Sequence, residues 1–380
     1  MTTTEDSSTT DVGTADSVEQ QVEQLAQRLL DATLGAMDLI AIYLGDRLGW
    51  YRSLADDGPA TPDELAARTG THPRYAREWL EQQAVSGLLA VQVPEQRTAA
   101  DDDEGARRRY ALPAAAAEVL TNPDSLAYLA PLGRMLAATA AHLPQLLTVY
   151  RTGGGVPWAE LGADAREAQA DMNRPWFEHQ LAPALAGVPD LDALLRRPGA
   201  RIADIGCGGA WSSIALARAY PDAVVDAYDV DGPTVEMARA NVAAAGLDDR
   251  VTVHHVGGDS LPAGTFDAVF AFECIHDMPR PVEVLAAARD ALVEGGVVVV
   301  MDEAVADSFT APGDEIERLM YGFSLTVCLP DGMAHPDSVG TGTVMRASTL
   351  TRYAVQAGFR AVDRLPIEDF GFWRFYRLVP

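Results

Sequence analysis

The most informative segment of this chain is Arg201-Ile-Ala-Asp-Ile-Gly206-Cys-Gly208-Gly209-Ala210. An apolar run ends there in a cluster of glycines, and an amphipathic segment from Trp211 to Tyr220 follows. This order is typical of a buried strand, a tight turn and the N-terminus of a helix. Glycine suits such a turn because the backbone bends sharply and a ligand must approach it closely. The segment therefore predicts the start of a nucleotide-binding βαβ unit.

A carboxylate follows the predicted second strand, 223–229. Asp229 comes 23 residues after Gly206, where it can accept hydrogen bonds from both hydroxyls of a ribose. The glycine pattern alone would also fit a dinucleotide. However, Asp204 stands just before the glycines, where its charge would repel a pyrophosphate and suit a cationic amine. These features favour a ligand that joins an adenosine to a cationic amino acid, as S-adenosylmethionine does.

The motif from Asp204 to Gly209 resembles motif I of the class I S-adenosylmethionine-dependent methyltransferases. Later landmarks fall in the order of that family, over roughly residues 180 to 380: a third strand at 251–256, a fourth at 266–272, a glycine turn into the fifth at 292–300, and two final strands from Phe359 and Phe372. The resemblance implies an α/β fold with a Rossmann-like, seven-stranded methyltransferase sheet.

The resemblance also implies S-adenosylmethionine as the cofactor. Asp229 is expected to bind the ribose, and Asp259 with Ser260 the adenine. The glycine turn and the region of Glu273 are expected to hold the methionine end. The complete set of expected cofactor residues is Asp204, Gly206, Cys207, Gly208, Asp229, Val230, Gly258, Asp259, Ser260 and Glu273.

Composition limits the remaining possibilities. The chain has 380 residues and a net charge of −26, and all 29 basic residues are arginine. Such an acidic surface disfavours nucleic acid and anionic membranes as partners. Three scattered cysteines indicate neither a disulfide framework nor a zinc site, and the acidic, polar N-terminus is not a signal peptide, so we expect a cytoplasmic protein. No ligand spacing for a metal stands out, and none is expected.

Four regions are expected along the chain: a disordered tail at 1–16, a winged-helix-like domain at 17–120, a helical linker and substrate cap at 121–195, and the cofactor-binding domain at 196–380. Within the second, Thr61-Pro-Asp-Glu64 is a capping box that begins a short helix, a second helix follows Thr71, and two strands end the module. This order is typical of a winged helix.

A winged helix suggests DNA binding, but residues 56–112 carry 11 acidic residues against 7 arginines. The basic surface of a DNA reader is therefore missing. The chain resembles small-molecule methyltransferases in which a domain of this kind mediates dimerisation, so we expect a homodimer. A ligand-sensing transcriptional regulator is the alternative.

Catalytic candidates follow the fourth strand, at the edge where ligands bind in such sheets. His276-Asp277 resembles the His-Asp pair of dimeric O-methyltransferases, in which the histidine is the general base, although Met278 stands where those relatives have tryptophan. A carboxylate after the fifth strand orients that histidine, and Glu303 matches the spacing better than Asp302. Alternatively, Asp277 caps the next helix and His276 is a packed core residue.

The acceptor is expected to be a small, partly apolar or aromatic metabolite of secondary metabolism, methylated at oxygen. Methyl transfer to carbon or nitrogen by proximity, without a base, is the alternative. Candidate substrate contacts lie in the linker and in the segment between the fifth strand and the last helix: Trp158, Asn173, Trp176, Met320, Tyr321 and His335.

Overall fold

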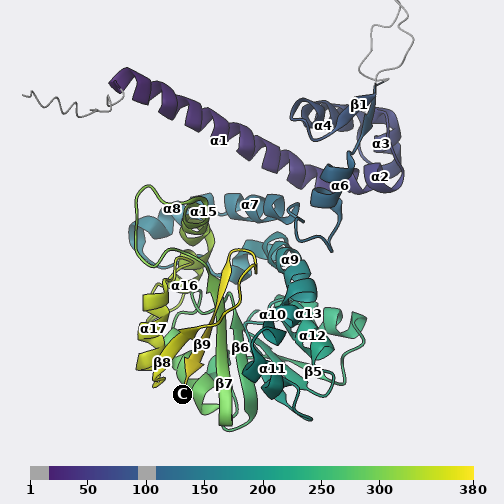
Figure 1. Cartoon of the computed structure of the whole chain (residues 1–380). Coiled ribbons are helices and arrows are strands. Elements are labelled where there is room, and N and C mark those ends of the chain that lie inside the picture. The colour runs from purple at the N-terminus through teal and green to yellow at the C-terminus, as the bar shows by residue number, and fades with distance from the viewer. Residues whose placement is uncertain (1–16, 93–107) are drawn as a thin grey trace, which may run out of the picture.

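The computed structural model describes residues 17–92 and 108–380, and the expected tail at 1–16 lies outside them. A seven-stranded sheet forms the centre of the larger module, with the strand order β5-β4-β3-β6-β7-β9-β8 (Figure 1). Within this sheet, β3 to β7 run parallel, whereas β9 is antiparallel to β7 and β8. Their bounds are β3 Arg201–Ile205, β4 Val224–Asp229, β5 Val251–His255, β6 Phe266–Phe272, β7 Leu292–Glu303, β8 Ala361–Arg364 and β9 Trp373–Val379. The predicted methyltransferase sheet is confirmed.

Helices cover both faces of this sheet because its inner strands are apolar on both sides. In β6, Phe270 packs into one core cluster, and Val269 and Ala271 pack into the other. One face is covered by α10 Ala182–Ala186, α11 Pro189–Leu195, α12 Trp211–Ala219 and α13 Gly232–Ala244. The other is covered by α14 Pro281–Asp290 and α17 Ala347–Gln356.

The N-terminal module has the expected winged-helix order. It comprises α1 Val18–Arg47, α2 Trp50–Asp56, α3 Pro62–Thr69, α4 Pro73–Val85, β1 Ala90–Gln92, β2 Arg109–Ala111 and α6 Ala114–Thr121. Thr61 and Glu64 form the predicted capping box at the start of α3. Trp50, Tyr51 and Leu80 belong to a separate core cluster. The first part of α1 extends away from the rest of the module as an isolated rod (Figure 1).

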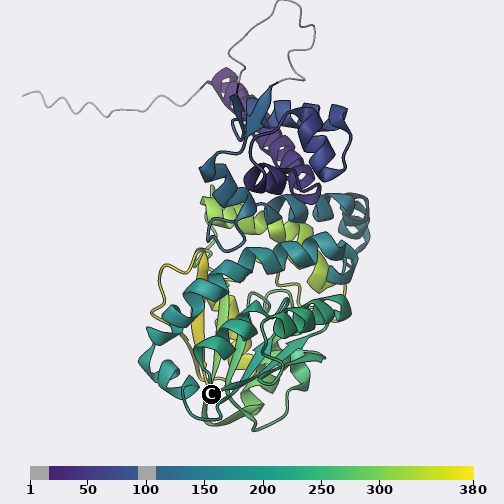
Figure 2. The ribbon, with the colours of Figure 1, turned by 90° about the vertical axis from the view of Figure 1, so that its right-hand side faces the viewer.

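A layer of helices separates the N-terminal module from the sheet in both views (Figures 1 and 2). It contains α7 Pro131–Ala141, α8 Leu143–Thr152, α9 Trp158–Trp176, α15 Glu315–Phe323, η3 Ser324–Cys328 and α16 Leu329–Met333. The following η1 Phe177–Leu181 continues α9 and joins the core cluster on the α12 face of the sheet. Buried Arg134 on α7 ties this layer to α1, since it pairs with Asp46 at 3.0 Å and with Asp171 of α9 at 2.8 Å. The layer lies over the carboxyl ends of the parallel strands. The division at 120/121 and 195/196 stays a prediction.

No helix in the described part of the chain combines the length and apolar character that crossing a membrane requires.

Candidate active site

The glycine turn after β3 has the backbone conformation that its sequence predicts. Gly206 and Gly208 have φ angles of +65° and +53°, a region that side chains disfavour. A Cβ atom on Gly206 would lie 2.7 Å from Cβ of Cys274. Cys207 is buried, and its N–H donates to the carbonyl of Tyr228 at 3.0 Å. The turn is thus held closely between β4 and the loop after β6.

Gly206→Ala should lower the free energy of unfolding by about 2 kcal/mol or more, because the left-handed backbone and the contact with Cys274 both resist a Cβ. Gly264→Ala is the matched control, since Gly264 has a φ of +57° and open space around it. Denaturant unfolding of both variants measures the difference. If both lose the same free energy, the close approach to Cys274 has no energetic weight.

Asp229 lies at the end of β4, beside this turn. Its carboxylate accepts hydrogen bonds from the N–H groups of Gly208 at 3.0 Å and Asp231 at 2.9 Å. Burial raises the pKa of Asp229. The following Val230 is 70% exposed. Asp229 is therefore a buried carboxylate fixed against the glycine turn, and the contacts of Asp229 and Val230 with a cofactor stay predictions.

The adenine candidates lie after β5, whose end is paired with the end of β4 through Asp229 and His255. Gly258, Asp259 and Ser260 form one short 3₁₀ turn, η2. Gly258 is buried, and a Cβ on it would lie 2.4 Å from the side chain of Ile205. Asp259 and Ser260 are exposed and bonded to each other at 3.3 Å.

Asp204 lies in β3, just before the glycine turn. It is fully buried, and its Oδ2 accepts hydrogen bonds from Ser212 at 2.6 Å and Ser213 at 2.5 Å, in the first turn of α12. Burial raises its pKa to about 6. Its Oδ1 has no partner among the described residues. Asp204 therefore fixes α12 against β3, and any contact with the methionine amine depends on Oδ1.

Glu273 follows β6 with a φ of +49°, which turns its side chain under the helical layer. Its carboxylate accepts hydrogen bonds from Asn173 on α9 and Trp373 on β9. Burial raises its pKa to about 7. Asn173, which the sequence suggests as a substrate contact, is thus bonded to a cofactor candidate. Trp373 is not among the site residues expected from the sequence, because it lies 100 positions from Glu273 and no local motif connects the two.

His276 is buried in the loop after β6, with 3% exposure. Its Nδ1 lies 3.0 and 3.1 Å from the two carboxylate oxygens of Asp302, at the end of β7. The spacing favoured Glu303, whose Oε2 lies 3.2 Å from the same nitrogen but accepts no hydrogen bond from the described residues. Asp302 is therefore the carboxylate that accepts the hydrogen bond of the ring in this structure, and the role of Glu303 stays a prediction.

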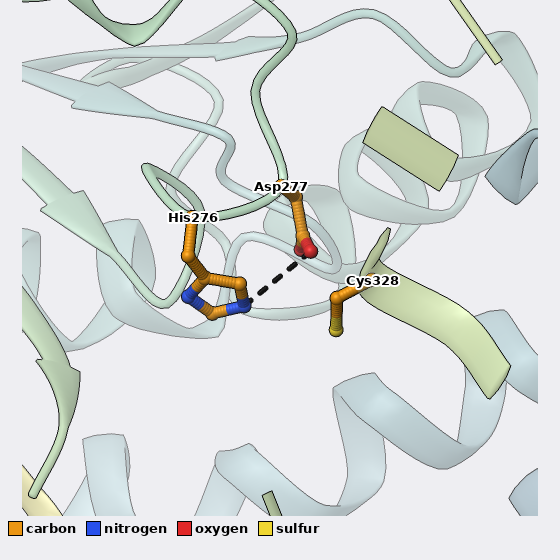
Figure 3. Close-up of side chains that lie close together, drawn as sticks. All are labelled: His276, Asp277 and Cys328. Atoms are coloured by element: carbon orange, nitrogen blue, oxygen red, sulfur yellow. Dashed lines mark ion pairs between the residues drawn. The ribbon is translucent and has the colours of Figure 1, made fainter. Parts of the chain in front are cut away.

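The other ring nitrogen of His276, Nε2, faces Asp277 and Cys328 of η3 (Figure 3). It lies 3.4 Å from Oδ1 of Asp277. Burial by itself would lower the pKa of His276, but the charges of Asp277, Glu303 and Asp302 outweigh it and raise the pKa well above the ordinary value. Asp277 does not cap α14, which has no side-chain cap. The alternative role for Asp277 is therefore not observed.

Comparisons with known proteins agree with this geometry. A family model described as a methyltransferase domain matches residues 202–296, and a model of an Rv2258c-like winged helix-turn-helix domain matches 35–122. The 27-O-demethylrifamycin SV methyltransferase of Amycolatopsis mediterranei is 30% identical over 190 residues, which cover 49% of this chain and 67% of that enzyme. The chain belongs to the S-adenosylmethionine-dependent methyltransferases. The N,N-dimethyltransferase OxyT of Streptomyces rimosus is 28% identical to this methyltransferase over 78% of the chain and 84% of OxyT.

Solved structures share the fold of the methyltransferase. The mitomycin 7-O-methyltransferase MmcR has a TM-score of 0.67 at 20% identity, covering 95% of this chain and 99% of that one. Human N-acetylserotonin methyltransferase in complex with S-adenosylmethionine also has a TM-score of 0.67, at 15% identity, covering 97% and 99%. The cofactor of the family is S-adenosylmethionine. The glycine turn, which has no room for a Cβ at Gly206, and the unpartnered Oδ1 of Asp204 fit such a ligand.

The substrate candidates of the methyltransferase lie in different environments. Trp158 begins α9, and its N–H donates to Asp331 at 2.7 Å. Trp176 packs on Trp373, with ring centroids 5.6 Å apart. Met320 is buried, whereas Tyr321 and His335 are exposed. Their contacts with substrate stay predictions.

Two groups of side chains in the described part of the methyltransferase have the composition to hold a metal ion: His276 with Asp277 and Cys328, and His276 with Asp302 and Glu303. Within each group the ligand atoms lie within 4.8 Å of one another. Long sequence separations hide both groups from motif analysis. A metal bound at either would occupy a ring nitrogen of His276, so metal binding and proton acceptance there are alternatives.

Proposed function

We propose that this methyltransferase methylates a hydroxyl group of a small, partly apolar or aromatic metabolite, with His276 as the general base. The observation that carries this proposal is the buried imidazole at the carboxyl end of β6. Its Nδ1 is hydrogen-bonded to Asp302, and its Nε2 points away from Asp302 towards Asp277. The Nδ1–H bond selects the tautomer with its lone pair at Nε2. That lone pair is the proton acceptor.

The sulfonium of the cofactor supplies an already activated methyl group, so this chain mainly has to align the acceptor and exclude water. A phenol has an ordinary pKa of about 10, and a base that takes its proton during transfer makes the oxygen a better nucleophile. The proton then rests on Nε2. Asp302 and Asp277 stabilise the resulting imidazolium, because they lie next to its two nitrogens.

The pH dependence of transfer follows from the raised pKa of His276. Only the neutral imidazole accepts a proton, and its fraction grows as the pH rises through that pKa. We expect kcat/KM for a hydroxyl acceptor to increase with pH, with a midpoint above the ordinary histidine value of about 6.5. Asp302→Asn removes one of the raising charges and should move the midpoint to lower pH. A midpoint that stays in place in this variant would contradict the role of Asp302.

For the cofactor, we propose the roles that the family resemblance gives. Asp229 accepts hydrogen bonds from the ribose hydroxyls, and Val230 with Gly258, Asp259 and Ser260 surrounds the adenine. The glycine turn approaches the methionine end. Glu273, and Asp204 through Oδ1, complete that end. In support, these residues lie at the carboxyl ends of neighbouring parallel strands, where such sheets bind ligands.

Transfer to nitrogen or carbon is the second candidate. The observation in its favour is the enclosure of His276 by three carboxylates, which keeps the ring protonated to a higher pH than usual. The similarity to OxyT, an N,N-dimethyltransferase, points in the same direction. An enzyme of this kind needs no base and would retain most of its kcat in His276→Ala.

We further propose that the methyltransferase is a homodimer joined through α1. The first part of this helix carries an apolar face that the chain itself leaves exposed, including Val22, Leu25, Leu29, Leu34 and Met37. Towards its C-terminal end, α1 borders an open apolar cavity of about 660 Å³ against α4, lined by Leu44, Leu48, Trp50, Tyr75 and Trp79. Exposed apolar surface of this extent is typical of protein interfaces. A second copy supplies the matching apolar face.

DNA is a poorer partner for this module. The two arginines of the expected recognition helix α4 pair with glutamates of the same helix, Arg74 with Glu78 at 2.5 Å and Arg77 with Glu81 at 3.2 Å. Their charges are thus largely compensated. Binding of a short duplex at low salt would favour the regulator instead.

The dimer is tested by Leu25→Glu combined with Leu29→Glu. Both side chains are exposed in the single chain, so the folded monomer should tolerate the change while the interface does not. We expect sedimentation to give a dimer for the wild type and a monomer for the variant. Gln24→Glu adds a charge at an exposed position of α1 that faces away from these apolar side chains, and this variant should remain dimeric. A variant that remains a dimer would place the interface elsewhere.

A further inference from the structure

Two carboxylates of this region, that of Asp277 next to His276 and that of Asp331 on α16, pair with no arginine of the described residues. Asp277, in the loop after β6, pairs only with His276, and its Oδ1 is buried without a hydrogen bond from the described residues. Asp331 on α16 accepts the N–H of Trp158 through Oδ1, and no cation of the described residues pairs with it. The two segments are in contact, because a Cβ on Gly332, the residue after Asp331, would lie 3.1 Å from the backbone carbonyl oxygen of Asp277.

Three other carboxylates with little exposure are paired with arginine. Asp231 pairs with Arg166 at 2.5 Å, Glu317 pairs with Arg346, and Asp46 pairs with Arg134 at 3.0 Å. Carboxylates removed from water without a cation are costly. Around His276, the three carboxylates of Asp277, Asp302 and Glu303 face a single imidazole, so a ligand cation would be stabilised there.

A third oxygen at this place also lacks a partner. Thr343 is 2% exposed, and its hydroxyl has no hydrogen-bond partner among the described residues. It lies beside the thiol of Cys328, which is also beside His276. The neighbouring Gly342 donates its N–H to the carbonyl of His276 at 3.2 Å, which holds this loop against the site. A hydroxyl oxygen accepts hydrogen bonds as a carboxylate does.

The positions of these oxygens separate them from the proposed cofactor residues. Asp331 and Thr343 belong to the segment between β7 and α17, whereas the cofactor candidates follow β3, β4, β5 and β6. From this geometry we infer that Asp277, Asp331 and Thr343 bind a protonated amine carried by the methyl acceptor. This inference rests on the proposed function, since it adds a substrate class to the same site. Each N–H of the ammonium group would meet one of these three oxygens, one from the loop after β6 and two from the segment between β7 and α17.

Calorimetry on the enzyme loaded with S-adenosylhomocysteine tests this without requiring methyl transfer. Tyramine is compared with 4-propylphenol, which has the same shape with a methyl in place of the ammonium. Burial raises the pKa of Asp331 to about 7, so pH 8 keeps this carboxylate largely ionised. We expect the wild type to bind tyramine about 10-fold or more tightly than 4-propylphenol. Asp331→Asn should weaken the binding of tyramine by about 10- to 100-fold and the binding of 4-propylphenol by less than about 3-fold.

Asp337→Asn is the matched control, because Asp337 is an exposed carboxylate of the same segment and asparagine tolerates its φ of +60°. It should bind both phenols as the wild type does. The inference would be overturned by a wild type that binds tyramine no more tightly than 4-propylphenol, or by an Asp331→Asn variant that keeps the preference for tyramine. It would also be overturned if Asp331→Asn weakened the binding of S-adenosylmethionine but not that of S-adenosylhomocysteine. The last would assign the carboxylate to the sulfonium.

The same measurements separate this inference from the proposed function. Amine preference in an enzyme that does not methylate oxygen would leave the amine site standing and refute the O-methylation. Methylation of the oxygen of 4-propylphenol by an enzyme that shows no preference for the amine would refute the amine site and leave the proposed O-methylation standing.

Discussion

His276→Ala is expected to lower kcat for a hydroxyl acceptor by about 10²- to 10⁴-fold, the usual contribution of a positioned general base. The effect should be large because the ring is held on both sides, by Asp302 at Nδ1 and by Asp277 near Nε2. Alanine removes the nitrogen that accepts the proton. Affinity for S-adenosylmethionine should change little, since the proposed cofactor residues are different ones.

Steady-state kinetics with labelled cofactor measures this effect, and binding of S-adenosylhomocysteine shows that the variant is folded. His179→Ala is the control, because His179 is exposed on η1 and lies outside the proposed site. It should retain wild-type kcat. If His276→Ala retained most of its activity, His276 would not be the general base. Methyl transfer to nitrogen or carbon, driven by proximity alone, would then be favoured.

Asp229→Ala is expected to weaken the binding of S-adenosylmethionine by about 100-fold or more, as expected for two lost charge-assisted hydrogen bonds. The carboxylate also accepts the N–H groups of Gly208 and Asp231, so its removal loosens the turn that approaches the cofactor. Asp229→Asn keeps the shape but not the charge and should fall between wild type and Asp229→Ala.

Equilibrium binding of S-adenosylmethionine to the purified variants measures this effect. Asp248→Ala, at an exposed position after α13, serves as the control and should bind as the wild type does. Wild-type affinity in Asp229→Ala would show that the ribose is bound elsewhere, and the proposed cofactor residues would have to be reassigned.

Local patterns in the sequence sufficed to predict the sheet and its cofactor edge. The strand before Gly206, the turn and Asp229 lie within one βαβ unit, so their contacts follow from short-range order. The capping box of Thr61 is equally local, and the structure contains it. Such features are set by backbone conformation and hydrophobic pattern, which neighbouring residues determine.

The surroundings of His276 could not be predicted in the same way. Asp302 and Glu303 are adjacent and both are buried, and only the packing at the end of β7 decides which one receives the hydrogen bond. Asn173 and Trp373 both donate hydrogen bonds to Glu273, although one lies 100 positions before it in the sequence and the other 100 positions after it. Asp331 and Thr343 reach the site on a segment without a recognisable motif.

The atom that receives the methyl group is the quantity on which this account depends. The wild type should be incubated with ¹³C-methyl S-adenosylmethionine and tyramine, which offers oxygen, nitrogen and ring carbon together, and the product examined by NMR. The account predicts a ¹³C-methyl group on the phenolic oxygen. A ¹³C-methyl group on nitrogen or on ring carbon would contradict it.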